Sequence, residues 1–302
     1  MKEIISYYYS IDVIDSINYE QYTIYKTSNS NYLFMEVADS NKLVFYNEII
    51  SSVSNTGFFS YKCKKNIYGE LFTKYYNNNY VLLDIGTDYK EEVDFVDMLS
   101  FYNKSSLYLS NNAKYNNNWE SIWENKISYL TNYFNNNFKT YKNYSVLFYF
   151  YISVAENSLL YIKKIKNKYM PTNKICFTHR RVFFPNRKIE FYNPFNFVID
   201  LQVRDIGEYI KSLYYSDEDY LEELHYYLKT NVLNPYLASM LYVRTIFPSI
   251  FFDDFENNTI DISKYINFEK YLNFTKKVYE VISSYTSIDK LYWNIYNTFY
   301  FR

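Results

Sequence analysis

The sequence predicts an α+β protein of two lobes, with a small antiparallel β lobe containing one helix over residues 1–88 and a larger, mainly helical lobe over residues 89–302. Early segments alternate between apolar and polar residues, as half-buried strands do. After residue 100, apolar residues recur at helical spacing over long stretches. Short apolar runs with two prolines interrupt this helical part at residues 175–200. A chain of 302 residues is long enough for a sizeable core.

Four segments of the first lobe predict strands, and the first two are joined by a turn at "NSN", which predicts a hairpin: 19–28, 32–39, 58–67 and 79–86. A helix is expected over residues 40–53, with Ser40 as its N-cap. Another is expected over residues 91–103, because acidic residues open an amphipathic stretch there.

Six segments of the second lobe predict helices: 118–138, 146–169, 204–215, 217–231, 235–247 and 268–285. The first carries Trp119 and Trp123 four residues apart, within one apolar stripe. Such a stripe is more often core than a platform for a ligand. We see no internal repeat.

The composition argues against a nucleic-acid-binding protein and indicates an AT-rich source genome. The net charge of -1, from 32 basic and 33 acidic residues, gives no reason to expect a nucleic-acid partner. Aromatic residues make up 23% of the chain and glycine only four positions, which we attribute to an AT-rich genome. Tyrosine cross-linking or carbohydrate stacking is the functional alternative. With so little glycine, turns that need positive φ are expected to use asparagine.

The remaining bulk features predict a cytoplasmic protein without membrane insertion. Cys63 and Cys176 are isolated and are expected to be buried thiols rather than metal ligands. The N-terminus has polar breaks where a signal peptide needs an apolar core. The longest uncharged stretches fall short of the ~20 residues that span a bilayer.

The stretch "CFTHRRVFFPNRKIEFYNPFNFVIDLQVRD", residues 176–205, carries the most specific pattern. His179 and Asn186 are seven residues apart, and Asp205 opens the next predicted helix. This arrangement resembles the catalytic loop of the kinase-like phosphotransferases, the superfamily of aminoglycoside and choline kinases. Their loop reads His-x-Asp-x-x-x-x-Asn, and a metal-binding Asp and a second Asp twelve residues later follow it. The resemblance implies a protein-kinase-like fold.

The chain departs from that pattern at the positions that carry chemistry. Arg181 stands where the resemblance places the catalytic base, and Asn193 stands where it places the metal-binding Asp. Arginine has donors only and cannot accept a proton, so Arg181 is expected to bind an anion or to pair with an acid such as Asp205 or Asp200. Asn193 and Asn186 are neutral, whereas Mg²⁺ prefers anionic oxygen ligands.

The first lobe departs in the same way. The strand "YLFMEVAD" has Met35 or Glu36 where the resemblance places a nucleotide-anchoring lysine. No glycine precedes Gly57, so the first hairpin lacks a glycine-rich phosphate cradle. We therefore expect no bound cofactor and no metal site.

Structural roles are expected for His179, which would support the loop, and for Asp205, which would cap its helix and tie the loop down. The adjacent acids Asp253 and Asp254 are expected to be solvated.

Within this superfamily the chain is similar to the spore-coat-associated proteins of the YutH and CotS type. Four segments carry that likeness: "NWESIWENKISYL", "SVAENSLLYI", "PFNFVIDLQVRDIGEYIKS" and "ASMLYVRTIFPSIFFDDFE". The missing base, metal-binding acid and lysine predict a catalytically inactive, kinase-like (pseudokinase) structural or scaffold protein, and the resemblance links it to the spore coat. The resemblance also implies coat or assembly proteins as partners, synthesis in the mother-cell cytoplasm and assembly on the spore surface.

Two other functions stay open. One is an unconventional ATP-dependent small-molecule phosphotransferase, which would bind Mg²⁺-ATP through relocated acids such as Glu190 or Asp200. Aromatic side chains filling the cleft, namely Phe183, Phe184 and Phe191, would argue against it. The other is a binding protein from a phage or an AT-rich bacterium, with no role in sporulation.

Overall fold

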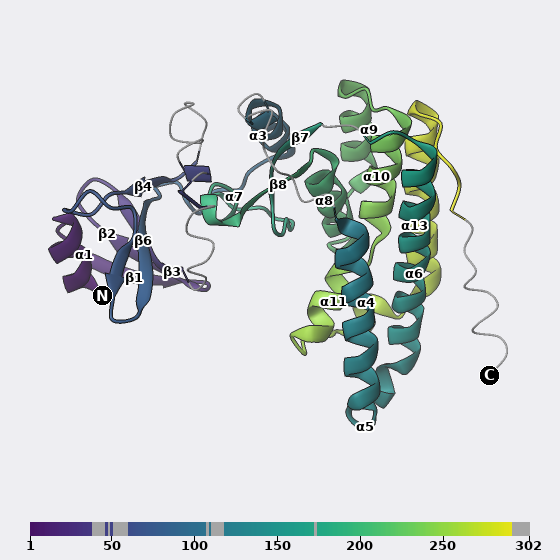
Figure 1. Ribbon diagram of the computed structural model, residues 1–302, viewed down its shortest axis with the longest axis horizontal. Coiled ribbons are helices and arrows are strands. Elements are labelled where there is room, and N and C mark those ends of the chain that lie inside the picture. Colours follow the sequence, from purple (N-terminus) through teal and green to yellow (C-terminus); the bar gives the residue numbers. More distant parts are fainter. Residues whose placement is uncertain are drawn as a thin grey trace. The chain divides into compact units, whose positions relative to one another are not determined.

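The computed structural model describes residues 1–37, 46–47, 49–50, 60–106, 109, 118–171 and 174–291. The chain divides into two compact units (Figure 1). The first comprises Met1–Ala113 and Pro185–Val198, and the second comprises Lys114–Phe184 and Ile199–Arg302. A small antiparallel sheet lies in the first and a larger set of helices in the second, which confirms the predicted α+β class. The predicted lobe boundary after residue 88 stays a prediction.

The sheet of the first unit is wholly antiparallel, in the order β1-β2-β3-β6-β4, with β5 also paired to β6. The strands are β1 (Asp15–Tyr19), β2 (Tyr22–Lys26), β3 (Asn31–Val37), β4 (Lys62–Lys64), β5 (Thr73–Tyr75) and β6 (Asn78–Asp84). The predicted first hairpin corresponds to β2 and β3. Strand β1 and the N-terminal helix α1 (Lys2–Tyr9) were not predicted.

Helix α1 belongs to the core of this unit, although polar residues interrupt its sequence. Ile4, Ile5 and Tyr9 of α1 share one buried cluster with residues from three strands: Tyr25, Tyr32, Phe34, Tyr80 and Leu82. Most of the helix predicted at residues 40–53, including Ser40, lies outside the described residues. The described part of this unit also contains helix α3 (Phe95–Ser106), the short α7 (Lys188–Phe191) and the turn η3 (Pro194–Asn196).

The prediction that asparagine supplies the positive φ angles was mostly wrong. The non-glycine residues with positive φ in the described part are Ser10, Glu20, Tyr76, Asp217 and Asn258. In the β5–β6 hairpin, Tyr75 faces Asn78, so Tyr76 enters the two-residue turn with φ 51°. Thr73 and Tyr80 are cross-strand partners in this hairpin, and both are buried. The strand register that buries them places Tyr76 in the turn, although tyrosine does not favour positive φ.

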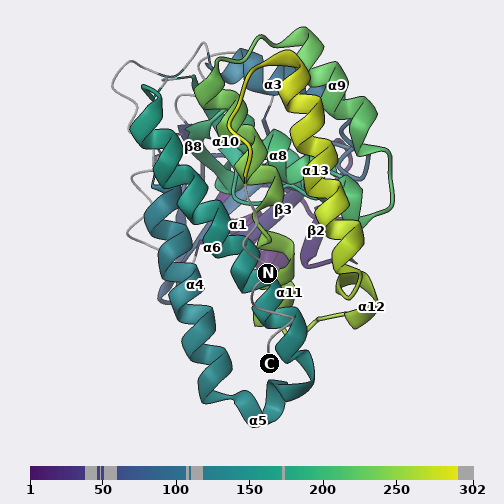
Figure 2. The same cartoon turned by 90° about the vertical axis from the view of Figure 1, so that its right-hand side faces the viewer.

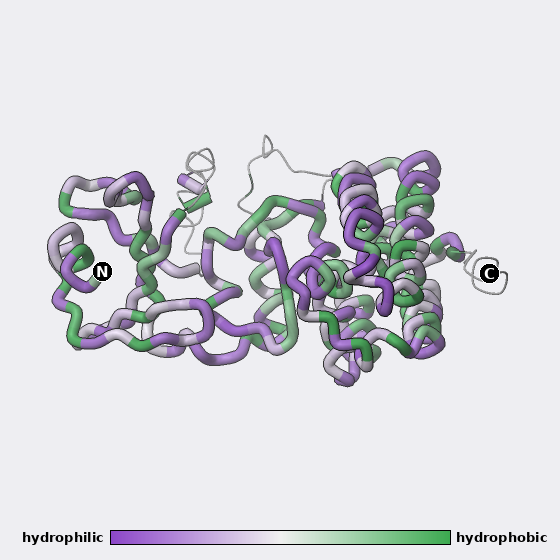
Figure 3. Tube along the Cα trace, turned by 90° about the horizontal axis from the view of Figure 1, so that it is seen from below, coloured by the Kyte–Doolittle hydropathy of each residue, from purple (hydrophilic) through white to green (hydrophobic). Residues whose placement is uncertain are grey.

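The second unit is built from antiparallel and crossing helices (Figure 2). They are α4 (Trp119–Asn136), α5 (Phe138–Tyr141), η2 (Lys142–Tyr144), α6 (Ser145–Lys168), α8 (Val203–Tyr215), α9 (Tyr220–Thr230), α10 (Pro235–Ile246), α11 (Ser249–Glu256), α12 (Ile262–Tyr265) and α13 (Phe268–Tyr285). Two strands, β7 (Ile175–His179) and β8 (Phe197–Leu201), pair with each other, and β8 belongs to this unit from Ile199 onward. Polar and apolar residues alternate along the helices (Figure 3), as amphipathic packing requires.

Helix α10 is the centre of this unit. All its residues from Tyr236 to Ile246 are buried, and it packs against α6, α8 and α13. Its contact with α8 is close, because Gly207 of α8 leaves room for Arg244. A Cβ at position 207 would lie 3.0 Å from the Cβ and Cγ of Arg244.

One helical stretch of the described residues, Phe138–Lys168, is long and apolar enough to cross a membrane. Within its most apolar window, 56% of the residues are buried inside the protein. A buried core helix passes the same test, and α6 packs here against α4 and α10. The stretch is therefore weak evidence for a membrane span, and the absence of membrane insertion stays an expectation.

A network of buried charges joins α8, α10 and α11. The Lys211 ammonium donates to Glu208 Oε2 at 3.0 Å and to the Ser249 hydroxyl at 2.6 Å. The Arg244 Nε forms an ion pair with Glu208 Oε1 at 2.6 Å. Burial alone would raise the pKa of Glu208, but Lys211 and Arg244 outweigh it and lower the pKa to about 2. Burial lowers the pKa of Lys211 to about 8, although the negative charge of Glu208 acts to raise it.

Replacing Glu208 should destabilise the protein strongly. Glu208→Gln leaves two buried cations without their carboxylate, and breaking a buried pair in this way costs about 3–5 kcal/mol. Urea or thermal unfolding measures the loss. The wild-type advantage should shrink as the pH falls from 4.5 towards 2, since the carboxylate contributes stability only while it is ionised.

The matched control is Glu156→Gln on α6, whose carboxylate is exposed. We expect its stability to stay within about 0.5 kcal/mol of wild type. Equal stability of the two variants would contradict the importance of the buried network.

Candidate functional site

The loop that resembles the catalytic loop of the kinase-like phosphotransferases begins at His179, the last residue of β7. The backbone N–H of His179 donates to Asp205 Oδ2 at 2.7 Å, and its ring Nδ1 lies 2.7 Å from the same oxygen. Both side chains are buried. Asp205 lies in the first turn of α8, while Gln202 is the N-cap residue. These contacts tie the end of β7 to α8, and the predicted structural roles of the two residues stay predictions.

Arg181, two residues further, is held by an acid that the sequence did not suggest. Its Nε and Nη2 donate to Asp253 Oδ2 at 2.6 Å and Oδ1 at 2.8 Å. Burial would lower the pKa of Arg181, but the bonds and charge of Asp253 outweigh it and raise the pKa. The expected partner was Asp205 or Asp200, so Asp253 of α11 is a correction.

The expectation that the adjacent acids of α11 are only solvated was wrong for both. Asp253 forms the bidentate pair with Arg181, and Asp254 accepts a hydrogen bond from the Tyr265 hydroxyl at 2.5 Å. Lys264 also lies 3.5 Å from Asp254. Their side chains are therefore committed to contacts within the helical unit.

Asp200 is similarly engaged. Its Oδ2 accepts from the Trp119 Nε1 at 2.9 Å and from Arg204 Nη1 at 2.6 Å, while its Oδ1 accepts from the Leu201 N–H at 2.7 Å. The side chain is almost fully buried. Three donors therefore satisfy the carboxylate inside the helical unit.

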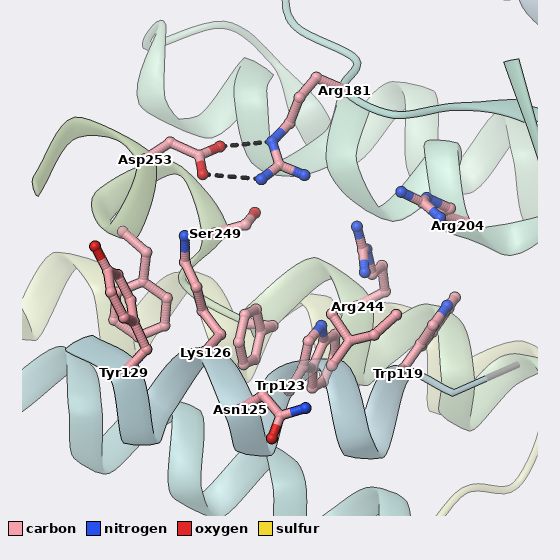
Figure 4. A pocket seen from close by; sticks show the side chains of 13 residues that line it. Trp119, Trp123, Asn125, Lys126, Tyr129, Arg181, Arg204, Arg244, Ser249 and Asp253 are labelled. Carbon is pink, nitrogen blue, oxygen red and sulfur yellow. Dashed lines mark hydrogen bonds and ion pairs between the residues drawn. The ribbon is translucent and has the colours of Figure 1, made fainter. Parts of the chain in front are cut away.

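A pocket of about 410 Å³ opens beside these residues (Figure 4). Helix α4 supplies one wall, and α10, α11, the loop after β7 and the start of α8 supply the others. Its lining consists of Trp119, Ile122, Trp123, Asn125, Lys126, Tyr129, Arg181, Arg204, Arg244, Phe247, Ser249, Phe252 and Asp253. All of them belong to the helical unit.

The lining of this pocket is cationic. Lys126, Arg181, Arg204 and Arg244 contribute positive charges, and Asp253 is the acid among the lining residues. Other acids that pair with these cations, namely Glu256, Asp200 and Glu208, are not lining residues. The pocket wall therefore presents more positive than negative charge to a ligand.

Trp119 and Trp123 belong both to the core and to the pocket floor. They are 1% and 3% exposed, as the predicted core stripe requires, but both also line the pocket. Their rings stack 5.8 Å apart with an interplanar angle of 21°, and Arg244 lies over both of them, at 5.1 Å and 5.7 Å.

The predicted site residues of the first unit are used in local contacts. Asn193 is the N-cap of η3, since its Oδ1 accepts from the Phe195 N–H at 3.0 Å. Its Nδ2 makes a weak contact of 3.7 Å with the Met35 sulfur on β3. Asn186 is buried, and its backbone carbonyl accepts from the Val93 N–H at 2.7 Å.

Metal-ligand clusters and disulfides are not found in the described part of the chain. No group of three or more His, Cys, Asp or Glu side chains comes together there as candidate metal ligands. Cys63 is partly exposed and Cys176 is buried, and both are free. Burial raises the pKa of the Cys63 thiol to about 12, so it is a poor nucleophile at neutral pH.

Sequence reasoning missed the importance of Lys126, Arg204 and Arg244. For Arg244 a signal existed, because it is the one charged residue in the apolar run "ASMLYVRTIF" of a buried helix. A charge inside such a run is costly unless it is paired.

Comparisons with known proteins agree with this architecture. An aminoglycoside phosphotransferase from Alicyclobacillus acidocaldarius has a TM-score of 0.59 at 9% identity, over 94% of each chain. Spectinomycin phosphotransferase in complex with ADP and spectinomycin has a TM-score of 0.53 at 12% identity, over 93% of this chain and 95% of that one. Amicoumacin kinase has a TM-score of 0.53 at 9% identity, over 95% of this chain and 94% of that one.

At these identities the likeness shows the fold alone, and it confirms the predicted two-lobed, kinase-like architecture. No curated protein matches the chain significantly. The sequence profile described as "Spore coat putative kinase YutH" matches residues 2–292, nearly the whole chain. The chain therefore belongs to the YutH family of spore coat kinase-like proteins.

Proposed function

We propose that this protein is a catalytically inactive, kinase-like scaffold of the spore coat. The observation that carries the proposal is the state of Arg181. It stands where the kinase-like superfamily has its catalytic base, and Asp253 holds its guanidinium through two hydrogen bonds. A permanent cation with donors only cannot take a proton from a substrate hydroxyl.

The position expected to bind the metal supports the same proposal. Asn193 is neutral, and its side-chain oxygen, the atom that would contact Mg²⁺, accepts a backbone N–H within η3. Its amide nitrogen contacts Met35, which with Glu36 is one of the two candidates for the position where the superfamily has a lysine for the nucleotide. Phosphoryl transfer relies on charge neutralisation at these positions.

Family membership supports a place at the spore coat. We propose synthesis in the mother-cell cytoplasm, assembly on the spore surface, and other coat or assembly proteins as partners, without nucleic acid or membrane insertion. Exposed large apolar residues on α4 and α6 would serve such contacts: Ile122, Tyr129, Val146, Tyr149 and Leu160.

The alternative, an unconventional small-molecule phosphotransferase, depends on Glu190 or Asp200 as a relocated metal ligand. The three donors to Asp200 argue against that residue. Glu190 is better placed, because its Oε1 is buried without a hydrogen-bond partner in the described residues. Burial and the nearby Glu20 raise the pKa of Glu190 to about 7, so the carboxyl is partly protonated at neutral pH. A partly protonated acid is a weak ligand for Mg²⁺.

The aromatic residues named for this choice occupy different surroundings. Phe191 packs against Phe101 in the first unit, with ring centroids 4.9 Å apart. Phe184 lies 6.2 Å from Tyr209 in the second unit, and Phe183 is 46% exposed. They do not form one cluster within either unit.

Nucleotide binding tests the proposal. Calorimetry and thermal shift with ATP, in Mg²⁺ and in EDTA, should show no binding at millimolar nucleotide, because the anchoring lysine and the metal carboxylate are absent. An active aminoglycoside phosphotransferase in the same buffers is the positive control. Mg²⁺-dependent binding in the micromolar range would overturn the proposal.

The pH dependence of stability tests Glu190 directly. Its pKa is raised from 4.5 to about 7 in the folded protein, so folding binds a proton and stability falls as the pH rises through this window. Glu190→Gln should therefore be more stable than wild type at pH 8, by on the order of 1 kcal/mol after allowance for solvent screening. The difference should close near pH 4.5.

Chemical denaturation at both pH values measures this difference, and Glu156→Gln is again the control. If Glu190 is instead a metal ligand, Mg²⁺ will stabilise wild type at pH 8 and leave Glu190→Gln unchanged. That outcome would favour the phosphotransferase.

A further inference from the structure

We propose that the cationic pocket of the helical unit binds small organic anions, in which a phosphate or carboxylate group is attached to a flat apolar body. Arg244 would be the main partner of the anionic group, and Tyr129 in the pocket wall would contact the body. This goes beyond the proposed function, because it requires neither nucleotide nor catalysis, and an active enzyme would be equally free to use it.

The first argument is the unused hydrogen-bonding capacity of Arg244. The side chain is 6% exposed and its Nε is paired with Glu208. That Nε is buried and, although it is ion-paired with Glu208, has no partner of hydrogen-bond geometry among the described residues; the guanidinium points into the pocket in Figure 4. A buried guanidinium with free donors is costly unless a ligand or water accepts them.

The second argument is the distribution of charge around that guanidinium. Arg181 and Arg204 approach the pocket from the side opposite α4, while Lys126 projects from α4 (Figure 4). Glu208 and Asp200 fix Arg244 and Arg204 without lining the pocket. An anion would therefore meet positive charges held in place beforehand, and a cationic amine would meet like charges.

The third argument is the shape and chemistry of the floor. The stacked indoles of Trp119 and Trp123 continue onto Phe247, whose ring lies 3.7 Å from that of Trp123 at an angle of 14°. The indole faces are largely covered by these rings and by Arg244, which leaves Tyr129, 54% exposed in the pocket wall, as the most accessible aromatic surface for a flat apolar body. The volume of about 410 Å³ lies within the range of small-molecule sites. Burial lowers the pKa of Arg244, although the nearby Glu208 carboxylate acts to raise it. A bound anion would offset the unfavourable burial of this positive charge.

The test uses ligands of one shape and different charge. Benzoate, benzamide and benzamidine are anionic, neutral and cationic, and phenyl phosphate carries the alternative anionic group. Binding is followed by calorimetry and by tryptophan fluorescence, since two of the three tryptophans line the pocket. We expect at least one of the two anions to bind tenfold or more tightly than benzamide, and benzamidine not to bind. The tighter anion identifies a carboxylate or a phosphate as the preferred group.

Two sets of variants place the binding in this pocket. Arg244→Gln should weaken anion binding tenfold or more, provided that circular dichroism shows a folded protein. Ile122 is half exposed in the pocket wall, so Ile122→Glu adds a negative charge without removing a polar contact. It should weaken anion binding severalfold, whereas the neutral control Ile122→Gln should leave it unchanged.

Equal affinity for benzoate, phenyl phosphate and benzamide would overturn the proposal. So would anion binding that is the same in wild type and Ile122→Glu. Neither result depends on whether the protein binds ATP, so this proposal and the proposed function can fail separately.

Discussion

The helical unit depends on the ion pairs and hydrogen bonds that the buried Glu208 carboxylate makes. This carboxylate lies between Lys211, Arg244 and Ser249 and so joins three helices at one point. The close approach of α8 and α10 at Gly207 brings Arg244 within reach. Buried charges are stable only when they are paired and hydrogen-bonded, so removing one member would leave the others uncompensated. The same pairing fixes the guanidinium that faces the pocket.

A second constraint connects the loop after β7 to the rest of the unit. His179 is bound to Asp205 on α8, and Arg181 is bound to Asp253 on α11. In the first unit, Asn193 caps its own turn. At the positions of Arg181 and Asn193 a kinase-like enzyme would need a group that reacts or binds a metal, and here the side chain is occupied by a structural contact. This is the physical content of the proposal that the family fold serves the coat without catalysis.

The sequence was a good guide to the long helices and to the β2–β3 hairpin. The helix predicted at 146–169 is Ser145–Lys168, and the last one is Phe268–Tyr285 as predicted. Their periodic apolar stripes are long enough to outweigh local ambiguity. Helix α1 was missed because eight residues with polar breaks give too short a pattern, and it is its packing on the sheet that buries it. The partner of Arg181 lies 72 residues away and that of Trp119 lies 81 residues away, distances over which a local pattern carries no information.

The most direct test of the central claim is a double-mutant cycle between Arg181 and Asp253. Unfolding free energies are measured for wild type, Arg181→Gln, Asp253→Asn and the double variant. If Arg181 has become a structural residue, each single variant loses stability and the double variant loses little more than either one. The coupling energy for this partly exposed bidentate pair should be about 1 kcal/mol. A coupling energy of zero, with single variants as stable as wild type, would contradict the account.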